Sequence, residues 1–190
     1  MGVVPLQRIQ ITGEPVLHTV AKEVPQITDS IRELVQDMYE TMDKAPGVGL
    51  AAPQIGVGLR IFVFSWEDQD VSYRGVAINP ELTVSPYDPA DCDPELDMEG
   101  CLSIPGERFP LARSQAATLI ATDLEGQQYT IEATGWLARI FQHEYDHLNG
   151  MLYADRLQKP YKKQMKKAIK ASGWGEPGFS WLPGQDYLEP

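Results

Sequence analysis

The sequence predicts one globular domain, residues 1–190, in which helices combine with antiparallel strands. With 190 residues, 43% of them hydrophobic, the chain is long enough to bury a core of its own. Apolar residues recur with helical spacing over 29–44 and 135–148, and strand-forming residues concentrate at 59–66 and 75–84. No internal repeat or linker divides the sequence, so we expect a single domain.

The first predicted helix runs from about Asp29 to Lys44. Ser30 and Glu33 have the spacing of a capping box near its start. Pro46 and Gly47 are expected to end it, because neither residue continues a helix well. The apolar residues of this segment fall on one stripe, as expected for a helix packed on a core: Ile31, Leu34, Val35, Met38 and Met42.

The strands are followed by an exposed loop, a hairpin and a C-terminal arm. The loop 86–97 carries five acids and three prolines. The runs ATLIATD and QQYTIEAT, joined by LEG with Gly126 in the turn, predict a β-hairpin. The segment 172–190 is rich in Gly and Pro, yet its apolar side chains favour an arm packed on the domain over a disordered end. Those side chains are Trp174, Phe179, Trp181 and Leu182.

Charge and hydropathy exclude several classes of protein. The formal net charge of −11 argues against DNA binding, and no apolar run approaches the length of a membrane span. The N-terminal segment has the pattern of neither a signal peptide nor a transit peptide, so we expect a cytoplasmic protein. In that reducing compartment Cys92 and Cys101 are expected to be free thiols or metal ligands rather than a disulfide.

A strongly basic segment, 159–171, departs from this acidic background. It contains six lysines and no acid, and the spacing of Tyr161, Met165 and Ile169 predicts an amphipathic helix. The simpler interpretation is a solvated lysine face. The alternative is a docking surface for an acidic partner such as ribosomal RNA, which would give contact with the ribosome.

The helix predicted over 135–148 carries the most informative motif, QHEYDHLNG. His143 and His147 stand four residues apart with Glu144 between them, so both imidazoles lie on one side of the helix. Apolar residues cover most of its circumference and leave Arg139, Gln142 and Asp146 on a narrow polar face. Two histidines and a glutamate on a buried face favour a metal site over a pair of core histidines.

A catalytic zinc-type site has three protein ligands and an open position, so a third ligand is required. Tyr153 occupies the position where the extended metalloprotease signature has a third histidine. Cys101 lies between a glycine and a short apolar segment, and a buried thiolate binds metals strongly, so chemistry favours this residue. The other candidates are His18, Cys92, Asp155 and Glu176.

Three motifs, in this order, resemble the signature motifs of the peptide deformylases: GVGLAAPQIG (47–56), EGCLSIPG (99–106) and QHEYDHLNG (142–150). The similarity extends over most of residues 5–170. The resemblance implies an α+β fold with antiparallel β-sheets around a central HExxH helix, plus N-terminal and C-terminal helices. It also implies a hydrolase of protein biosynthesis that removes the N-formyl group from the N-terminal methionine of nascent polypeptides and releases formate.

Carried over to this sequence, the resemblance assigns Cys101, His143 and His147 to one divalent metal ion and leaves a fourth position for water. It implies Fe²⁺ as the natural metal, with Zn²⁺, Ni²⁺ or Co²⁺ able to occupy the site. Glu144 would take the proton of the water and later pass it to the leaving amine.

The resemblance also indicates how the substrate is held. The backbone N–H of Leu102 and the side-chain amide of Gln54 would stabilise the oxyanion. Glu99 and Arg113 are expected either to pair and steady the cysteine segment or to form a simple surface ion pair. The GVGLA segment would let the peptide approach Gly49 closely and pair as an added strand. The pocket for the methionine side chain is expected to be lined by Val48, Trp136 and Ile140.

Two other functions are compatible with the HExxH pattern. A metallo-endopeptidase with an acidic third ligand would need a long cleft, and it would leave the first two motifs unexplained. A protein with a structural metal would close its site with a fourth ligand, Cys92 or His18, and leave Glu144 without a role. Formate release from a formyl-methionyl peptide would separate these alternatives.

Overall fold

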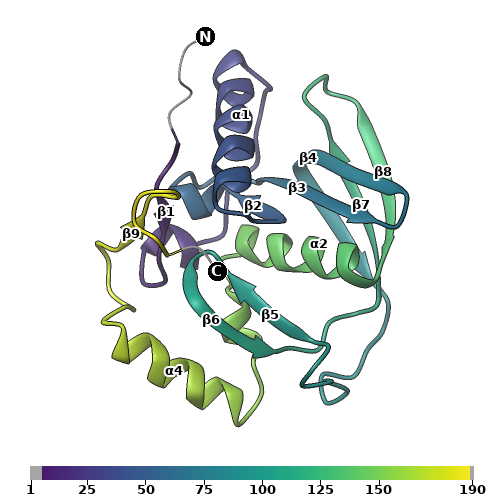
Figure 1. Ribbon diagram of the computed structural model, residues 1–190. Coiled ribbons are helices and arrows are strands. Elements are labelled where there is room, and N and C mark those ends of the chain that lie inside the picture. Colours follow the sequence, from purple (N-terminus) through teal and green to yellow (C-terminus); the bar gives the residue numbers. More distant parts are fainter. Residues whose placement is uncertain (1–5, 189–190) are drawn as a thin grey trace.

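The computed structural model describes residues 6–188 and has the α+β architecture predicted from the sequence. Helix α2, which carries the HExxH motif, runs through the centre with antiparallel sheets on either side (Figure 1). The helices are α1 (Asp29–Lys44), α2 (Gly135–Leu148), α3 (Tyr153–Arg156) and α4 (Tyr161–Ala171), with 3-10 turns at Pro15–His18 and Ala52–Ile55. The strands are β1 (Ile9–Gln10), β2 (Gly49–Ala51), β3 (Ile61–Asp68), β4 (Val71–Val84), β5 (Met98–Cys101), β6 (Ile104–Pro110), β7 (Ala116–Thr122), β8 (Gln128–Thr134) and β9 (Ser180–Trp181).

The larger sheet has five antiparallel strands in the order β2-β3-β4-β7-β8. The predicted hairpin forms β7 and β8, and it pairs in register from Ala116 opposite Thr134 to Thr122 opposite Gln128. Strand β4 begins at Val71, four residues before the predicted start, because polar residues beyond the core continue the β3–β4 ladder as an exposed ribbon. Strand β2 lies at the edge of this sheet, so one of its sides is open to pairing.

Aromatic packing joins this sheet to helix α2. The ring of Phe141 is buried between the rings of Phe62 and Phe64 on β3, with centroid distances of 6.1 and 5.0 Å. The contact fixes the rotation of the helix and directs its opposite side, which bears the two histidines, toward strand β5.

The smaller sheet pairs β5 with β6 and supplies the segment that contains Cys101. A third core cluster lies behind it, where Tyr153 of α3 and Met165 of α4 pack under the two strands. The lysines of α4 are exposed while Met165 is buried, which confirms the predicted amphipathic helix. No helix among residues 6–188 is long and apolar enough to cross a membrane.

Helix α1 packs its apolar stripe on the core as predicted, with Val35, Met38 and Met42 fully buried. The predicted capping box is wrong. The helix begins at Asp29, so Thr28 is the N-cap residue, and Ser30 is already a helical position.

The C-terminal arm is packed on the domain, whereas the acidic loop is mostly exposed. Strand β9 pairs with β1 near the N-terminal end of the described chain, and Trp181 is fully buried (Figure 1). The loop 86–97 is exposed over most of its length, as expected from its five acids. Cys92 and Asp97 are partly buried, and Asp97 ion-pairs with Arg139 of α2.

Phe141→Ala should lower the free energy of unfolding by about 3–5 kcal/mol, because it opens a cavity between helix and sheet that the backbone cannot close. Phe179→Ala, at an exposed position of the arm, is the matched control and should cost under about 1 kcal/mol. Urea unfolding followed by circular dichroism measures both values. Equal losses would show that the Phe141 contact does not hold helix to sheet.

Candidate metal centre and active site

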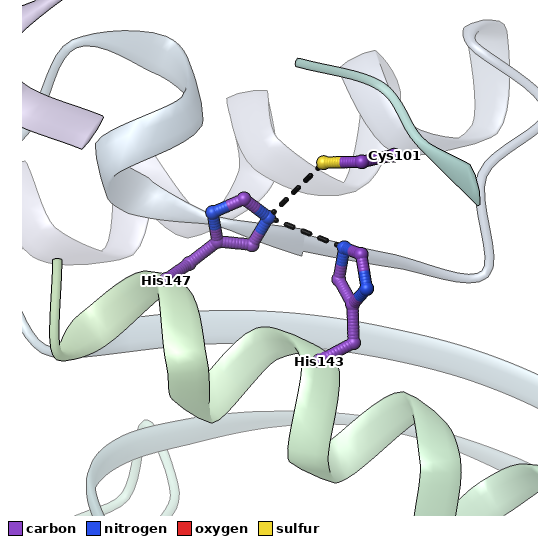
Figure 2. Close-up of side chains that lie close together, drawn as sticks. All are labelled: Cys101, His143 and His147. Atoms are coloured by element: carbon purple, nitrogen blue, oxygen red, sulfur yellow. Dashed lines mark hydrogen bonds between the residues drawn. The ribbon is translucent and has the colours of Figure 1, made fainter. Parts of the chain in front are cut away.

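Three side chains from two elements converge beside helix α2 (Figure 2). The Nε2 atoms of His143 and His147 are 3.3 Å apart, and Cys101 Sγ lies 3.4 Å from His147 Nε2. All three donor atoms lie within 4.8 Å of one another, and the residues are buried. The structure thus brings together one thiol from β5 and both histidines of the HExxH motif.

The hydrogen bond of His143 shows which of its ring nitrogens faces this centre. His143 Nδ1 lies 2.7 Å from Glu99 Oε1, and Glu99 is buried beside Arg113. Although burial opposes ionisation, Arg113 and His143 lower the pKa of Glu99, so the carboxylate accepts and Nδ1 carries the hydrogen. Because Glu99 binds Nδ1, the Nε2 atom of His143 is the one that faces Cys101 and His147.

The two histidines have different electrostatic environments. Burial disfavours an imidazolium, but the Cys101 thiolate and Glu99 outweigh it and raise the pKa of His143. Burial and the neighbouring charge on His143 lower the pKa of His147. Two imidazole nitrogens and a thiolate are donors suited to a divalent transition metal, and their convergence leaves room for further ligands on the cavity side. The residues present therefore fit such an ion.

The other candidates for the third ligand lie elsewhere. Asp155 accepts the backbone N–H of Leu152 at the start of α3, and His18 accepts that of Gly13. Cys92 lies in the acidic loop, and Glu176 is exposed on the arm. Within residues 6–188, Cys101, His143 and His147 form the single group of three side chains placed so that they could hold a metal ion.

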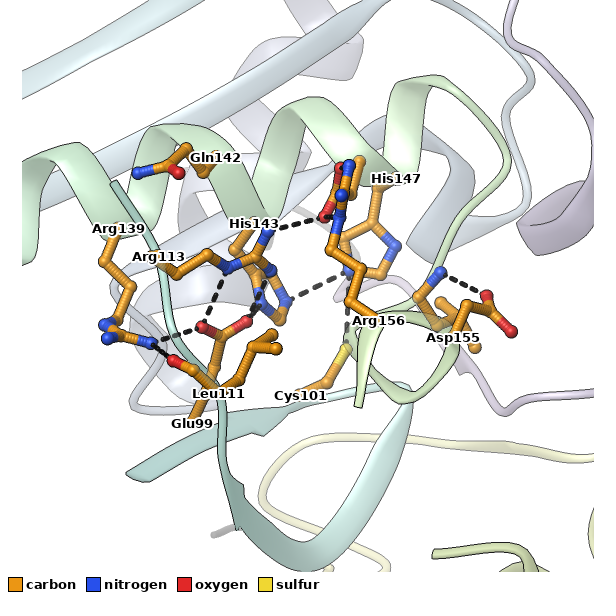
Figure 3. Close-up of polar contacts among 12 residues, drawn as sticks. Glu99, Cys101, Leu111, Arg113, Arg139, Gln142, His143, His147, Asp155 and Arg156 are labelled. Atoms are coloured by element: carbon orange, nitrogen blue, oxygen red, sulfur yellow. Dashed lines mark hydrogen bonds and ion pairs between the residues drawn. The ribbon is translucent and has the colours of Figure 1, made fainter. Parts of the chain in front are cut away.

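A buried network of alternating charges supports this centre (Figure 3). Arg113 binds both oxygens of Glu99, at 2.7 and 3.1 Å, as the predicted pairing requires. The polar face of α2 is buried as well, because Arg139 binds Glu99 at 2.9 Å and Asp146 binds Arg113 at 2.7 Å. Asp97 and Arg156 extend the network at its two ends. The roles of four residues in this network were not predicted from the sequence: Asp97, Arg139, Asp146 and Arg156.

Glu144 stands next to the metal-binding group and outside this network. It is buried, and its Oε2 atom has no hydrogen-bond partner within the described residues. Burial raises the pKa of Glu144 to about 7. Gly49 of β2 makes room for it, because a β-carbon at this position would overlap the Glu144 carboxyl group. The site therefore holds a carboxyl group that can bind or release a proton near neutral pH.

The amide of Gln54 is oriented from both ends. Its Oε1 accepts the backbone N–H of Ala51 at 2.9 Å, which turns Nε2 toward Ser103 Oγ at 3.3 Å and Cys101 Sγ at 3.8 Å. The backbone N–H of Ser103 also donates to Cys101 Sγ, at 3.4 Å. Ser103 was not among the predicted site residues, although it lies inside the second motif.

A cavity of about 370 Å³ opens onto the site. Its wall includes every residue predicted to contact the substrate or the oxyanion: Val48, Gly49, Gln54, Leu102, Trp136 and Ile140. Trp66 and Arg108 also line it, and neither was predicted. Trp136 is 40% exposed and lies with its ring centroid 6.1 Å from that of Trp66, so the outer wall of the cavity is aromatic.

The fold and the site define an α+β protein whose HExxH helix faces a cysteine strand, and comparison with known proteins identifies its family. The polypeptide deformylase family model matches residues 6–163. The chain is 50% identical over 187 residues to the peptide deformylase of Tropheryma whipplei, covering 92% of each. It is 47% identical over 193 residues to that of Mycolicibacterium smegmatis, covering 97% of this chain and 96% of the relative. The chain belongs to the polypeptide deformylase family.

Solved structures of the family have the same fold. The peptide deformylase of Synechococcus elongatus, solved in complex with actinonin, superposes with a TM-score of 0.77 at 34% identity, covering 92% of this chain and 91% of that one. The Thermus thermophilus enzyme superposes with a TM-score of 0.74 at 38% identity, covering 87% and 94%. The predicted fold class and the predicted family are both confirmed.

Cys101→Ala or His147→Ala should lower the bound divalent metal steeply, because each removes one of three converging donors. Cys92→Ala is the matched control, a cysteine in the exposed loop, and should leave metal content nearly intact. Metal analysis of the purified proteins by mass spectrometry measures this. Loss of metal from the Cys92 variant with retention in the Cys101 variant would contradict the ligand assignment.

In the metal-free protein, Glu144→Gln should raise the free energy of unfolding relative to wild type, and this difference should grow as pH rises from about 4.5 to about 7. In this window the unfolded wild type releases the Glu144 proton while the native state keeps it, so native wild type loses stability with rising pH. One pKa unit corresponds to about 1.4 kcal/mol, so the pH-dependent part should reach about 3 kcal/mol. Urea unfolding of both chelator-treated proteins across this range tests the sign. A stability difference independent of pH would refute the raised pKa of Glu144.

Proposed function

We propose that this protein is a metal-dependent deformylase that removes the N-formyl group from the N-terminal methionine of nascent polypeptides and releases formate. One observation carries the proposal: Cys101, His143 and His147 converge while Glu144 beside them has no partner, at the inner end of a cavity bordered by an edge strand. The names of its relatives in the polypeptide deformylase family agree with this activity.

Cys101, His143 and His147 would hold one divalent ion, which we propose to be Fe²⁺, with Zn²⁺, Ni²⁺ or Co²⁺ able to replace it. When bound, such an ion supplies Lewis acidity and lowers the pKa of a water to about 7 in zinc-type sites. Glu99 orients the imidazole of His143, and Arg113 with Arg139 holds Glu99 in place.

Other residues around the ion would carry out proton transfer and stabilise the oxyanion. Glu144 takes the proton of the attacking water and gives it to the leaving amine, a task suited to a group with a pKa near 7. Gln54 Nε2 and the Leu102 N–H would donate to the oxygen on which negative charge develops. A neutral amide already turned by Ala51 suits this role, because little reorganisation is needed as the charge appears.

The surroundings of the site fit a short, extended substrate. Strand β2 has an open edge, so the peptide backbone would pair beside Gly49 as an added strand. The methionine side chain would enter the apolar part of the cavity formed by Val48, Trp136 and Ile140. The formyl carbon carries only hydrogen beyond its oxygen and nitrogen, so the space near Glu144 can be narrow.

We further propose that the protein acts in the cytoplasm, where nascent chains emerge. Helix α4 presents an exposed row of lysines that would favour contact with the ribosome, while the strongly acidic remainder of the chain disfavours binding to DNA. The endopeptidase alternative lacks support from the site, because the third donor is a thiol rather than an acid.

Glu144→Gln should keep the metal bound while turnover of a formyl-methionyl peptide falls by roughly two to four orders of magnitude, because the amide keeps the shape and removes the base. Metal content and formate release are measured on the same preparation. Glu132→Gln, on the exposed face of β8, is the control and should keep full activity. Full activity with bound metal in the Glu144 variant would remove this residue from the mechanism.

Formyl-Met-Ala peptides should release formate, whereas acetyl-Met-Ala peptides should react at least about 10-fold more slowly, since one added methyl must enter a closely packed space. An unfolded protein should show no internal cleavage. Formate is measured by a coupled dehydrogenase assay and cleavage by mass spectrometry. Internal cleavage without formate release would favour the endopeptidase.

A further inference from the structure

The indole of Trp181 is fully buried, although this residue lies on the C-terminal arm, beyond the residues 6–163 that match the family model. Strand β9 holds it there by pairing with β1, where Trp181 lies opposite Ile9. The indole Nε1–H donates to the carbonyl oxygen of Leu102 at 2.8 Å. The arm therefore reaches the residue next to the metal-binding Cys101.

This hydrogen bond acts on the same peptide group that contacts the thiol. The Leu102 carbonyl and the Ser103 N–H belong to one peptide plane, and that N–H donates to Cys101 Sγ at 3.4 Å. Trp181, the peptide and the sulfur thus form two hydrogen bonds in series. Hydrogen bonds in series polarise one another and fix the orientation of the group between them.

The arm is also linked to the next carbonyl, indirectly through Thr12. Thr12 N–H donates to the Ser103 carbonyl at 2.9 Å, and Gly175 N–H, on the arm, donates to the Thr12 carbonyl at 3.1 Å. The hydroxyl of Ser103 in turn accepts from Gln54 Nε2. The segment that carries Cys101 and Leu102 is therefore held by hydrogen bonds from Trp181, Thr12 and Gln54.

We propose that Trp181 is a positioning residue of the metal centre. By binding the Leu102 carbonyl it aligns the Leu102–Ser103 peptide, so that the Ser103 N–H points at Cys101 Sγ and the adjoining Leu102 N–H keeps its place at the site. The inference rests on the proposed function and deepens it. Trp181 acts through the peptide and lines no part of the cavity.

The first test compares Trp181→Phe with Trp174→Phe, the same change at a half-buried tryptophan of the same arm. Loss of a group that orients a metal ligand typically costs 10–100-fold in affinity or activity, so Trp181→Phe should release zinc to a chelator about 10-fold faster. The exchange of the Ser103 amide hydrogen should also accelerate, with exchange in the β7–β8 hairpin, which belongs to another core cluster, unchanged. Trp174→Phe should match the wild type in both.

A purely structural role for Trp181 would give a different result. In that case Trp181→Phe would lower the unfolding temperature and speed amide exchange throughout the domain, with no selective change at Ser103 or in zinc release. If Trp181 is a positioning residue, kcat of the Trp181→Phe enzyme should fall about 10-fold while its KM stays within about 2-fold of wild type. The lost alignment affects the reacting centre and not the binding of substrate. A change confined to KM would overturn it.

The second test uses the wild-type chain and does not depend on the folding of a variant. Zinc is added to the metal-free protein while the indole and amide N–H resonances are followed by NMR. The Trp181 indole and the Ser103 amide should both shift on zinc binding, and the Trp174 indole should not. A Ser103 shift without one at Trp181 would refute the positioning role alone. No shift at either residue would refute the metal site, and the positioning role with it.

Discussion

The carboxylate of Glu99 is the group on which the arrangement of the site depends. It receives hydrogen bonds from Arg113 to both oxygens, from Arg139 to one and from His143 Nδ1 to the other. A carboxylate buried to this degree would be costly without such partners. Because Glu99 lies on β5 while Arg139 and His143 lie on α2, its bonds fix the distance between the cysteine strand and the histidine helix.

The same network balances its own charge. Three carboxylates, of Asp97, Glu99 and Asp146, alternate with three guanidinium groups. The guanidinium groups are those of Arg113, Arg139 and Arg156. Removing one member leaves an uncompensated buried charge, which typically costs about 3–5 kcal/mol. The network is therefore best understood as a unit that sets geometry, since a buried ion pair alone gives little net stability.

The spacing of apolar residues along the sequence predicted most of the helices and strands. The stripe of α1, the period of α2 and the hairpin of β7 and β8 all follow from residues close in sequence, whose spacing decides which faces are apolar. In the site, the four-residue spacing of His143 and His147 predicted that both imidazoles would share a face. The chemistry of a buried thiolate then favoured Cys101, and the three motifs supported it.

Residues that act through distant partners could not be predicted in this way. Arg139 and Asp146 have helical spacing on a polar face, and only tertiary contacts with Glu99 and Arg113 show that this face is buried. One feature of the sequence did indicate this burial. Apolar residues cover most of the helix, so little of its surface is left to expose charged side chains to solvent. Trp181 gave no comparable signal, because its partner is a backbone carbonyl 79 positions away.

The two buried glutamates at the site have opposite environments, and this contrast separates their roles. Glu99 has all its acceptor positions occupied by cationic or N–H donors, and its pKa is lowered. Glu144 lies beside the same His143, yet one of its oxygens has no partner within residues 6–188, and burial raises its pKa to about 7. A carboxylate held fully bonded can orient a ligand but cannot readily accept a proton. The carboxyl group with an oxygen left free can, and this difference supports the proposed roles: Glu99 orients a ligand, and Glu144 transfers a proton.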